Sequence, residues 1–172
     1  MKTLLVGLDN PNSTDPSHAL SPLPSTGTGG RLLELIREHE PEYGPRDYLS
    51  DFFRTNLYPT RRAHVGKGMA DADRDQIAFL RHYVEQIDVP DVVLLGNRVV
   101  AAFNSLYDED LNWLKCRVIA DGNGPRRFWA LPHPSGRNRW YNDADNYAAA
   151  GKLLVTLARS RTPFTESLEV MP

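Results

Sequence analysis

Short apolar segments alternate with helical segments along this chain, and this alternation constrains the fold more than any other feature of the sequence. Four apolar segments are short enough to be strands, namely residues 3–6, 52–58, 91–96 and 127–131. Segments with helical spacing of apolar residues lie between or after them, at residues 31–37, 71–86, 98–106 and 143–159. Strands separated by helices favour a parallel sheet with helices on both faces. The sequence therefore predicts an α/β fold, a three-layer α/β/α sandwich around a central, mostly parallel four-stranded sheet.

The length and the cysteine content limit what else the chain can be. Its 172 residues suffice for a full hydrophobic core, and we expect residues 1–172 to form a single domain. No apolar run approaches the ~20 residues that cross a bilayer, and the apolar N-terminal segment is typical of a first strand rather than a signal peptide. The single cysteine, Cys116, excludes an internal disulfide and a four-cysteine metal site. We expect a cytoplasmic monomer.

The net charge of −2 does not by itself indicate a partner that is a nucleic acid. Basic residues nevertheless gather locally, at residues 61–67, 126–127 and 137–139. A nearly neutral protein can bind a phosphate backbone if its basic residues share one face. Each of these clusters taken alone also fits an ordinary solvated surface, so the sequence leaves both interpretations open.

Three polar loops follow expected strands, and parallel strands place the loops at their carboxyl ends on one edge of the sheet. These loops are residues 7–11, 56–59 and 131–138. Open α/β sheets bind their ligands at that edge, so the sequence predicts a site there. Singly, Asp9 and Asn10 also fit a plain turn before proline, Asn56 a turn cap, and His133 a loop histidine without function. The long polar segment 8–30 is expected to be functional or disordered.

The order of these loops resembles that of the uracil-DNA glycosylase superfamily. Residues 7–11 resemble the Gly-x-(Asp/Asn/Ala)-Pro motif after the first strand, and residues 133–138 resemble the His-Pro-Ser loop of the single-strand-selective monofunctional branch. Residues 56–59 are similar to the base-reading asparagine segment of that same branch. The turn at 93–101 resembles a Leu-Gly-x-x-Ala motif of several branches, and 27–33 the glycine-rich helix start of the thermostable branch. The resemblance extends over residues 3–158.

The resemblance implies an enzyme that acts on DNA, flips a uracil or a related modified pyrimidine out of the stack, and hydrolyses its N-glycosidic bond. It implies no metal and no cofactor. Asp9 or Asn10 would position the water, and His133 would donate a hydrogen bond to the departing base. Asn56 would read the pyrimidine edge, with Tyr58 and His18 as candidates for the aromatic platform. The residues implied in DNA binding, with Arg137 as a wedge or strand contact, are Ser135, Gly136, Arg137, Asn138 and Arg139.

The first motif departs from the family pattern by one extra residue. Asp9 has the expected spacing from Gly7, whereas Asn10 has the expected position directly before Pro11. A carboxylate can act as a base, but an asparagine can only orient water. Two alternatives therefore stand beside the glycosylase: a protein that binds a base or nucleic acid without excising it, as in a viral DNA-modification pathway, and an enzyme that processes free nucleotides.

Overall fold

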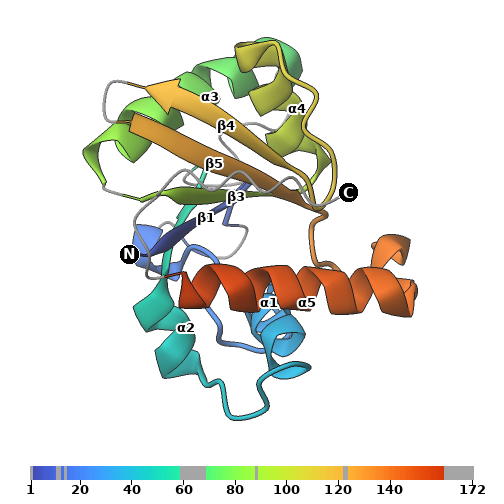
Figure 1. Cartoon of the computed structure of the whole chain (residues 1–172). Coiled ribbons are helices and arrows are strands. Elements are labelled where there is room, and N and C mark those ends of the chain that lie inside the picture. Colours follow the sequence, from blue (N-terminus) through green and yellow to red (C-terminus); the bar gives the residue numbers. More distant parts are fainter. Residues whose placement is uncertain are drawn as a thin grey trace.

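The computed structural model describes residues 2–10, 13, 15–58, 69–87, 89–121 and 124–160, and of residues 69–74 it describes the backbone alone. Its centre is a five-stranded sheet in the order β2-β1-β3-β5-β4 (Figure 1). The strands are β1 (Thr3–Gly7), β2 (Phe52–Asn56), β3 (Asp91–Leu95), β4 (Cys116–Asp121) and β5 (Gly124–Leu131). All neighbours pair in parallel except β4, which is antiparallel to β5.

Helices cover both faces of this sheet (Figure 1). One face carries α1 (Thr28–Arg37), α2 (Pro45–Asp51) and α5 (Ala144–Arg159), and the other carries α3 (Met69–Gln86) and α4 (Asn97–Tyr107). Among the described residues, the short 3-10 helices η1 (Pro16–His18) and η3 (Arg139–Asn142) lie in the loops. The predicted α/β/α sandwich with a mostly parallel sheet is therefore confirmed. Within the described residues, no helix has both the length and the apolar character that crossing a membrane requires.

The central strand β3 explains how one sheet serves two cores. Its side chains alternate between the faces, as successive residues of a strand must. Val92 and Leu94 belong to the apolar cluster beneath α3 and α4, whereas Val93 and Leu95 belong to the cluster beneath α1 and α5. All four side chains are fully buried. The uninterrupted apolar run that predicted this strand is the consequence of burial on both faces.

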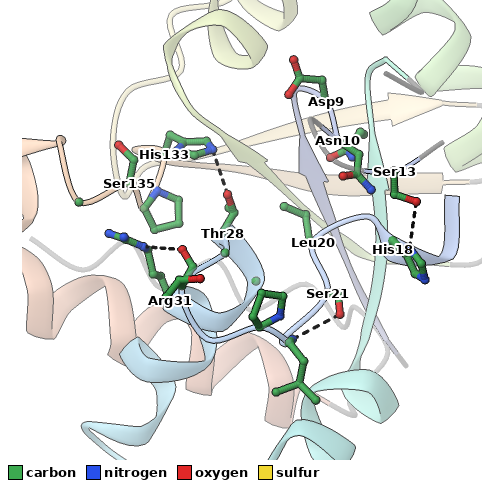
Figure 2. A pocket seen from close by; sticks show the side chains of 18 residues that line it. Asp9, Asn10, Ser13, His18, Leu20, Ser21, Thr28, Arg31, His133 and Ser135 are labelled. Carbon is green, nitrogen blue, oxygen red and sulfur yellow. Dashed lines mark hydrogen bonds between the residues drawn. The ribbon is translucent and has the colours of Figure 1, made fainter. Parts of the chain in front are cut away.

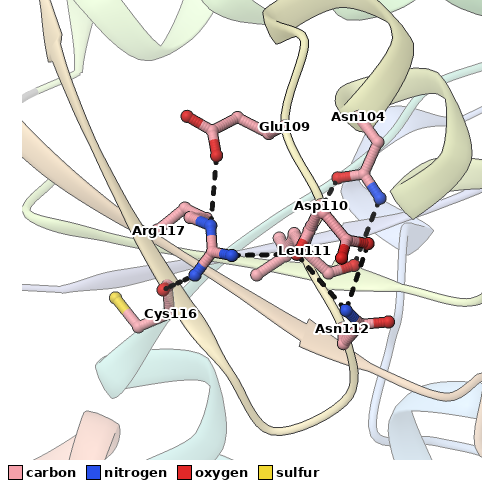
Figure 3. A network of polar contacts seen from close by, with 7 residues as sticks. All are labelled: Asn104, Glu109, Asp110, Leu111, Asn112, Cys116 and Arg117. Carbon is pink, nitrogen blue, oxygen red and sulfur yellow. Dashed lines mark hydrogen bonds and ion pairs between the residues drawn. The ribbon is translucent and has the colours of Figure 1, made fainter.

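The fifth strand, β4, was not predicted. It lies at the edge of the sheet, and none of residues 116–120 is buried, so it lacks an apolar run. Its approach is fixed by polar contacts (Figure 3): the Asn104 side chain bonds both the N–H (2.9 Å) and the carbonyl oxygen (3.2 Å) of Leu111, and Arg117 Nε donates to Glu109 at 3.1 Å. The sequence analysis also missed the helix α2. The basic cluster at residues 61–67, together with Pro11 and Pro59, lies outside the described residues.

Candidate active site

The predicted polar loops meet at one edge of the sheet. Gly7 at the end of β1 lies beside Asn56 at the end of β2, and Leu95 of β3 lies beside Leu131 of β5. A cavity of about 630 Å³ opens at this edge (Figure 2). Seven of the predicted site residues line it, namely Asp9, Asn10, His18, Asn56, His133, Ser135 and Gly136.

The wall formed by Asn56 depends on the absence of a side chain at Gly7. An ideal Cβ on Gly7 would lie closer than 3.0 Å to Asn56 Oδ1, a distance that real Cβ atoms do not reach. Beyond the strand ends the backbones stay paired, because Leu57 N–H donates to Gly7 O and Tyr58 N–H to Leu8 O, both at 2.9 Å. Asn56 Oδ1 is buried and accepts no hydrogen bond from any described residue. The first and second polar loops are thus held in a fixed relation.

The backbone around His133 is held by hydrogen bonds from its own loop. The Asn138 side-chain amide donates to His133 O at 3.0 Å, and Tyr141 OH donates to Pro132 O at 2.7 Å. Behind the loop, Gly96 has a φ of +94°, which glycine adopts without strain. An ideal Cβ there would lie 3.2 Å from His133 Cβ. The position of the imidazole is therefore set before any ligand arrives.

The charge state of His133 follows from its surroundings. Burial lowers the pKa of this imidazole, the Asp9 carboxylate opposes that shift, and the Arg31 guanidinium adds to it. His133 is therefore neutral at pH 7 and has one N–H to donate. The Thr28 hydroxyl lies 3.3 Å from His133 Nε2 (Figure 2), and either atom can be the donor, depending on the tautomer.

A third wall comes from the start of α1, which sequence reasoning did not assign to the site. Gly27 is the N-cap and Thr28 the first helical residue, so the free N–H groups of the first turn give this wall a partial positive charge. Arg31 also lines the cavity, and its Nε donates to Thr26 O at 3.3 Å. An ideal Cβ on Gly136 would lie 2.7 Å from Arg31 Nη1. The glycine-rich helix start was the signal that could have revealed Thr28 and Arg31.

The remaining predicted residues lie elsewhere. Tyr58 is buried in the core against α3 and α4 and lines a neighbouring, more apolar cavity of about 400 Å³. Asn138 does not line the main cavity and instead caps η3, where its Oδ1 accepts from Trp140 N at 3.1 Å. Arg137 and Arg139 are exposed beyond the cavity. His18, by contrast, is one of the seven residues that line the cavity, and its Nδ1 lies 2.9 Å from Ser13 Oγ (Figure 2).

The site can orient a polar ring and stabilise negative charge. The Asn56 amide and the neutral His133 imidazole face one cavity, and Arg31 lines it beside them. Asp9 and Asn10, the two candidates for holding water, line the same cavity. Across the described ranges, no three His, Cys, Asp or Glu side chains are grouped so that they could hold a metal ion.

The sequence model of the family described as the Uracil DNA glycosylase superfamily matches residues 6–157. No curated protein matches the chain. The matched region contains every residue that lines the cavity.

Proposed function

The chain belongs to the uracil-DNA glycosylase superfamily, and from this we propose that it releases uracil or a related modified pyrimidine from DNA by hydrolysing the N-glycosidic bond. The observation that carries the proposal is the convergence of Asp9, Asn56 and His133 on one cavity. These residues come from three segments far apart in the sequence. A pyrimidine in that cavity would have an amide, an imidazole and a carboxylate within one enclosure.

The proposed reaction is a displacement at the anomeric carbon of deoxyribose. The oxygen of water bonds to that carbon while the bond to the base nitrogen breaks, and the electron pair leaves with the base. Asp9 or Asn10 holds the water, and only Asp9 can also accept its proton. Negative charge builds on the base carbonyl oxygen, where the N–H of neutral His133 donates a hydrogen bond. Asn56 recognises the base edge, because its amide offers both a donor and an acceptor.

The DNA strand is proposed to run past the walls formed by α1 and the His133 loop. Ser135, Gly136 and Arg31 line the cavity next to the positively charged start of α1, which suits a phosphate group. Arg137 and Arg139 are exposed just beyond and are assigned to the strand outside the cavity. The target base must leave the stack to reach the cavity.

The test is base release from oligonucleotides that contain uracil or 5-hydroxymethyluracil, in single and double strands, followed by alkaline cleavage at the abasic site. We expect Asn56→Ala and His133→Ala each to reduce release by at least about 10²-fold, the scale of lost acid–base or electrostatic stabilisation. His82→Ala is the matched control, because His82 is an exposed histidine of α3 that does not line the cavity. Circular dichroism checks that each variant is folded.

Full activity in both site variants would contradict the proposal. Binding of modified DNA by the wild-type protein without abasic sites would favour the protein that binds a base without excising it. Base release from free nucleotides but not from DNA would favour a nucleotide-processing enzyme.

A further inference from the structure

The hydroxyl of Thr28 meets the imidazole that the proposed function places on the departing base. Thr28 Oγ1 lies 3.3 Å from His133 Nε2, and both residues line the cavity (Figure 2). Both side chains are half-buried, so a ligand in the cavity can reach them. Of the two ring nitrogens, Nε2 is therefore the one beside the hydroxyl. The proposed reaction uses the imidazole but assigns nothing to Thr28.

The backbone that carries Thr28 is held against the loop that precedes α1. An ideal Cβ on Gly29 would come closer than 3.0 Å to the carbonyl oxygen of Leu20. An ideal Cβ on Gly30 would come equally close to the backbone of Ser25. The first turn of α1 therefore has little room to shift. A donor in a fixed position suits the stabilisation of developing charge, because it needs no reorganisation during the reaction.

Two donors as close as this pair can share one acceptor. An oxygen about 2.8 Å from each atom, an ordinary hydrogen-bond distance, forms a triangle with Thr28 Oγ1 and His133 Nε2. A carbonyl oxygen has two lone pairs and can accept both hydrogen bonds. The arrangement requires the imidazole proton to be on Nε2. The Thr28 oxygen then accepts from Nε2 in the free protein and keeps its own proton to donate.

We propose that Thr28 is a second catalytic donor, whose hydroxyl shares with His133 the oxygen on which the departing base collects negative charge. The inference rests on the proposed function, because only a released base develops that charge. The bound oxygen replaces the Thr28 hydroxyl as acceptor of the Nε2 hydrogen bond, and the hydroxyl turns its proton toward the same oxygen. The free N–H groups of the first turn of α1 and the Arg31 guanidinium add positive potential on this wall.

The first test removes the hydroxyl and keeps the shape of the side chain. Thr28→Val should slow single-turnover uracil release from DNA by about tenfold, equivalent to ~1.4 kcal/mol. Thr28→Ser, which keeps the hydroxyl, should retain most of the rate. Thr156→Val is the matched control, because Thr156 is an exposed threonine of α5 that does not line the cavity.

The acidity of the base distinguishes a donor to the leaving oxygen from a contact with a backbone phosphate. 5-Fluorouracil leaves as a more stable anion than uracil and depends less on donors. The loss in Thr28→Val should therefore be at least about threefold smaller for 5-fluorouracil than for uracil. An oligonucleotide with 2′-fluoro-2′-deoxyuridine resists release, because the fluorine withdraws electrons from the sugar. Its affinity should change by less than about twofold, since no charge has developed on its base.

Two measurements are independent of turnover. The NMR shifts of the ring nitrogens in the free wild-type protein should place the imidazole proton of His133 on Nε2. Free 5-nitrouracil is acidic enough to be an anion near neutral pH and mimics the departed base. It should bind wild type and Thr28→Ser about tenfold more tightly than Thr28→Val. If the protein releases no base from any DNA, the proposed function fails, while these two measurements still test Thr28.

Four results would overturn the assignment. A proton on Nδ1 would mean that Thr28 donates to Nε2, which then has no hydrogen to give. Unchanged release by Thr28→Val would show that the hydroxyl is not used. Equal losses on uracil and 5-fluorouracil, with weaker binding of the 2′-fluoro oligonucleotide, would assign Thr28 to a phosphate. A 5-nitrouracil affinity that is the same in wild type and Thr28→Val, or undetectable in wild type, would show that the hydroxyl does not face the base.

Discussion

Two side chains of opposite charge act on the imidazole of His133. Burial is the largest cause of its lowered pKa, Asp9 opposes the shift and Arg31 increases it. Arg31→Gln should therefore raise the pKa of His133, and Asp9→Asn should lower it further. Titration of the imidazole protons by NMR measures both. Arg46→Gln, an exposed arginine of α2 outside the cavity, serves as the control, and equal pKa values in all variants would refute this electrostatic account.

The same lowered pKa couples His133 to the stability of the fold. The unfolded chain has a histidine pKa near 6.5, so between that value and the lower folded pKa the unfolded chain binds more protons. The free energy of unfolding therefore decreases as the pH falls from 6.5 toward the folded pKa, and this contribution is fully restored above 6.5.

For single residues of the site, the sequence predicted those that directly follow strands but not those that belong to a helix. Asp9, Asn56 and His133 could be predicted to meet, because parallel strands bring their carboxyl ends to one edge. Arg31 could not, because it reaches the cavity from the first turn of α1, whose glycines also fit a purely packing role. Tyr58 was one candidate for the aromatic platform that the resemblance implies, yet its side chain is buried in the core on the α3 and α4 side.

Among the elements, the start of α1 packs closely against the loop that precedes it. Gly29→Ala would gain helix propensity of up to about 1 kcal/mol, but its Cβ would press on the carbonyl oxygens of Leu20 and Ser21. We expect the clash to dominate and the variant to lose about 1–3 kcal/mol, the usual cost of overpacking. Urea unfolding measures the loss.

Gly27→Ala provides the comparison at the same helix end. A Cβ on Gly27 would meet only Pro24 O, at 3.3 Å, so we expect a change of less than about 1 kcal/mol. A Gly29→Ala protein as stable as wild type, or more stable, would show that the loop yields and is not tightly seated.

The two elements missed by the sequence, β4 and α2, were missed for different physical reasons. β4 pairs on one side only, is partly exposed along its length, and depends on Asn104 and Arg117 rather than on an apolar run. A run of apolar residues identifies a strand buried inside the sheet, such as β3. An edge strand that faces solvent on one side has no such run and is harder to predict. The helix α2 spans seven residues, which is too short to show a clear helical period.

In the molecule as a whole, the cavity lies at the carboxyl ends of the parallel strands, and a buried ion pair lies toward the opposite, amino-terminal end of β3. Asp91, at the start of β3, is fully buried and accepts from Arg127 at 2.7 and 2.6 Å and from Trp129 Nε1 at 2.9 Å. Asp91→Ala removes the buried carboxylate of this ion pair and should cost about 3–5 kcal/mol of stability. At a temperature where it stays folded, base release should match wild type.

Thermal unfolding and activity of the same preparation test this separation. Asp75→Ala, an exposed aspartate of α3, is the control and should change neither quantity measurably. Loss of base release in folded Asp91→Ala protein would mean that the two edges of the sheet are coupled.

The cavity joins loops that are more than a hundred residues apart in the chain, since Asp9 follows the first strand and His133 the last. A nascent chain that ends before residue 133 has the walls formed by Asn56 and by the start of α1 but lacks the His133 loop. We therefore expect the nascent protein to bind no base before the His133 loop has been synthesised. A truncated product that ends before residue 133 is expected to be inert toward DNA bases, whatever secondary structure it retains.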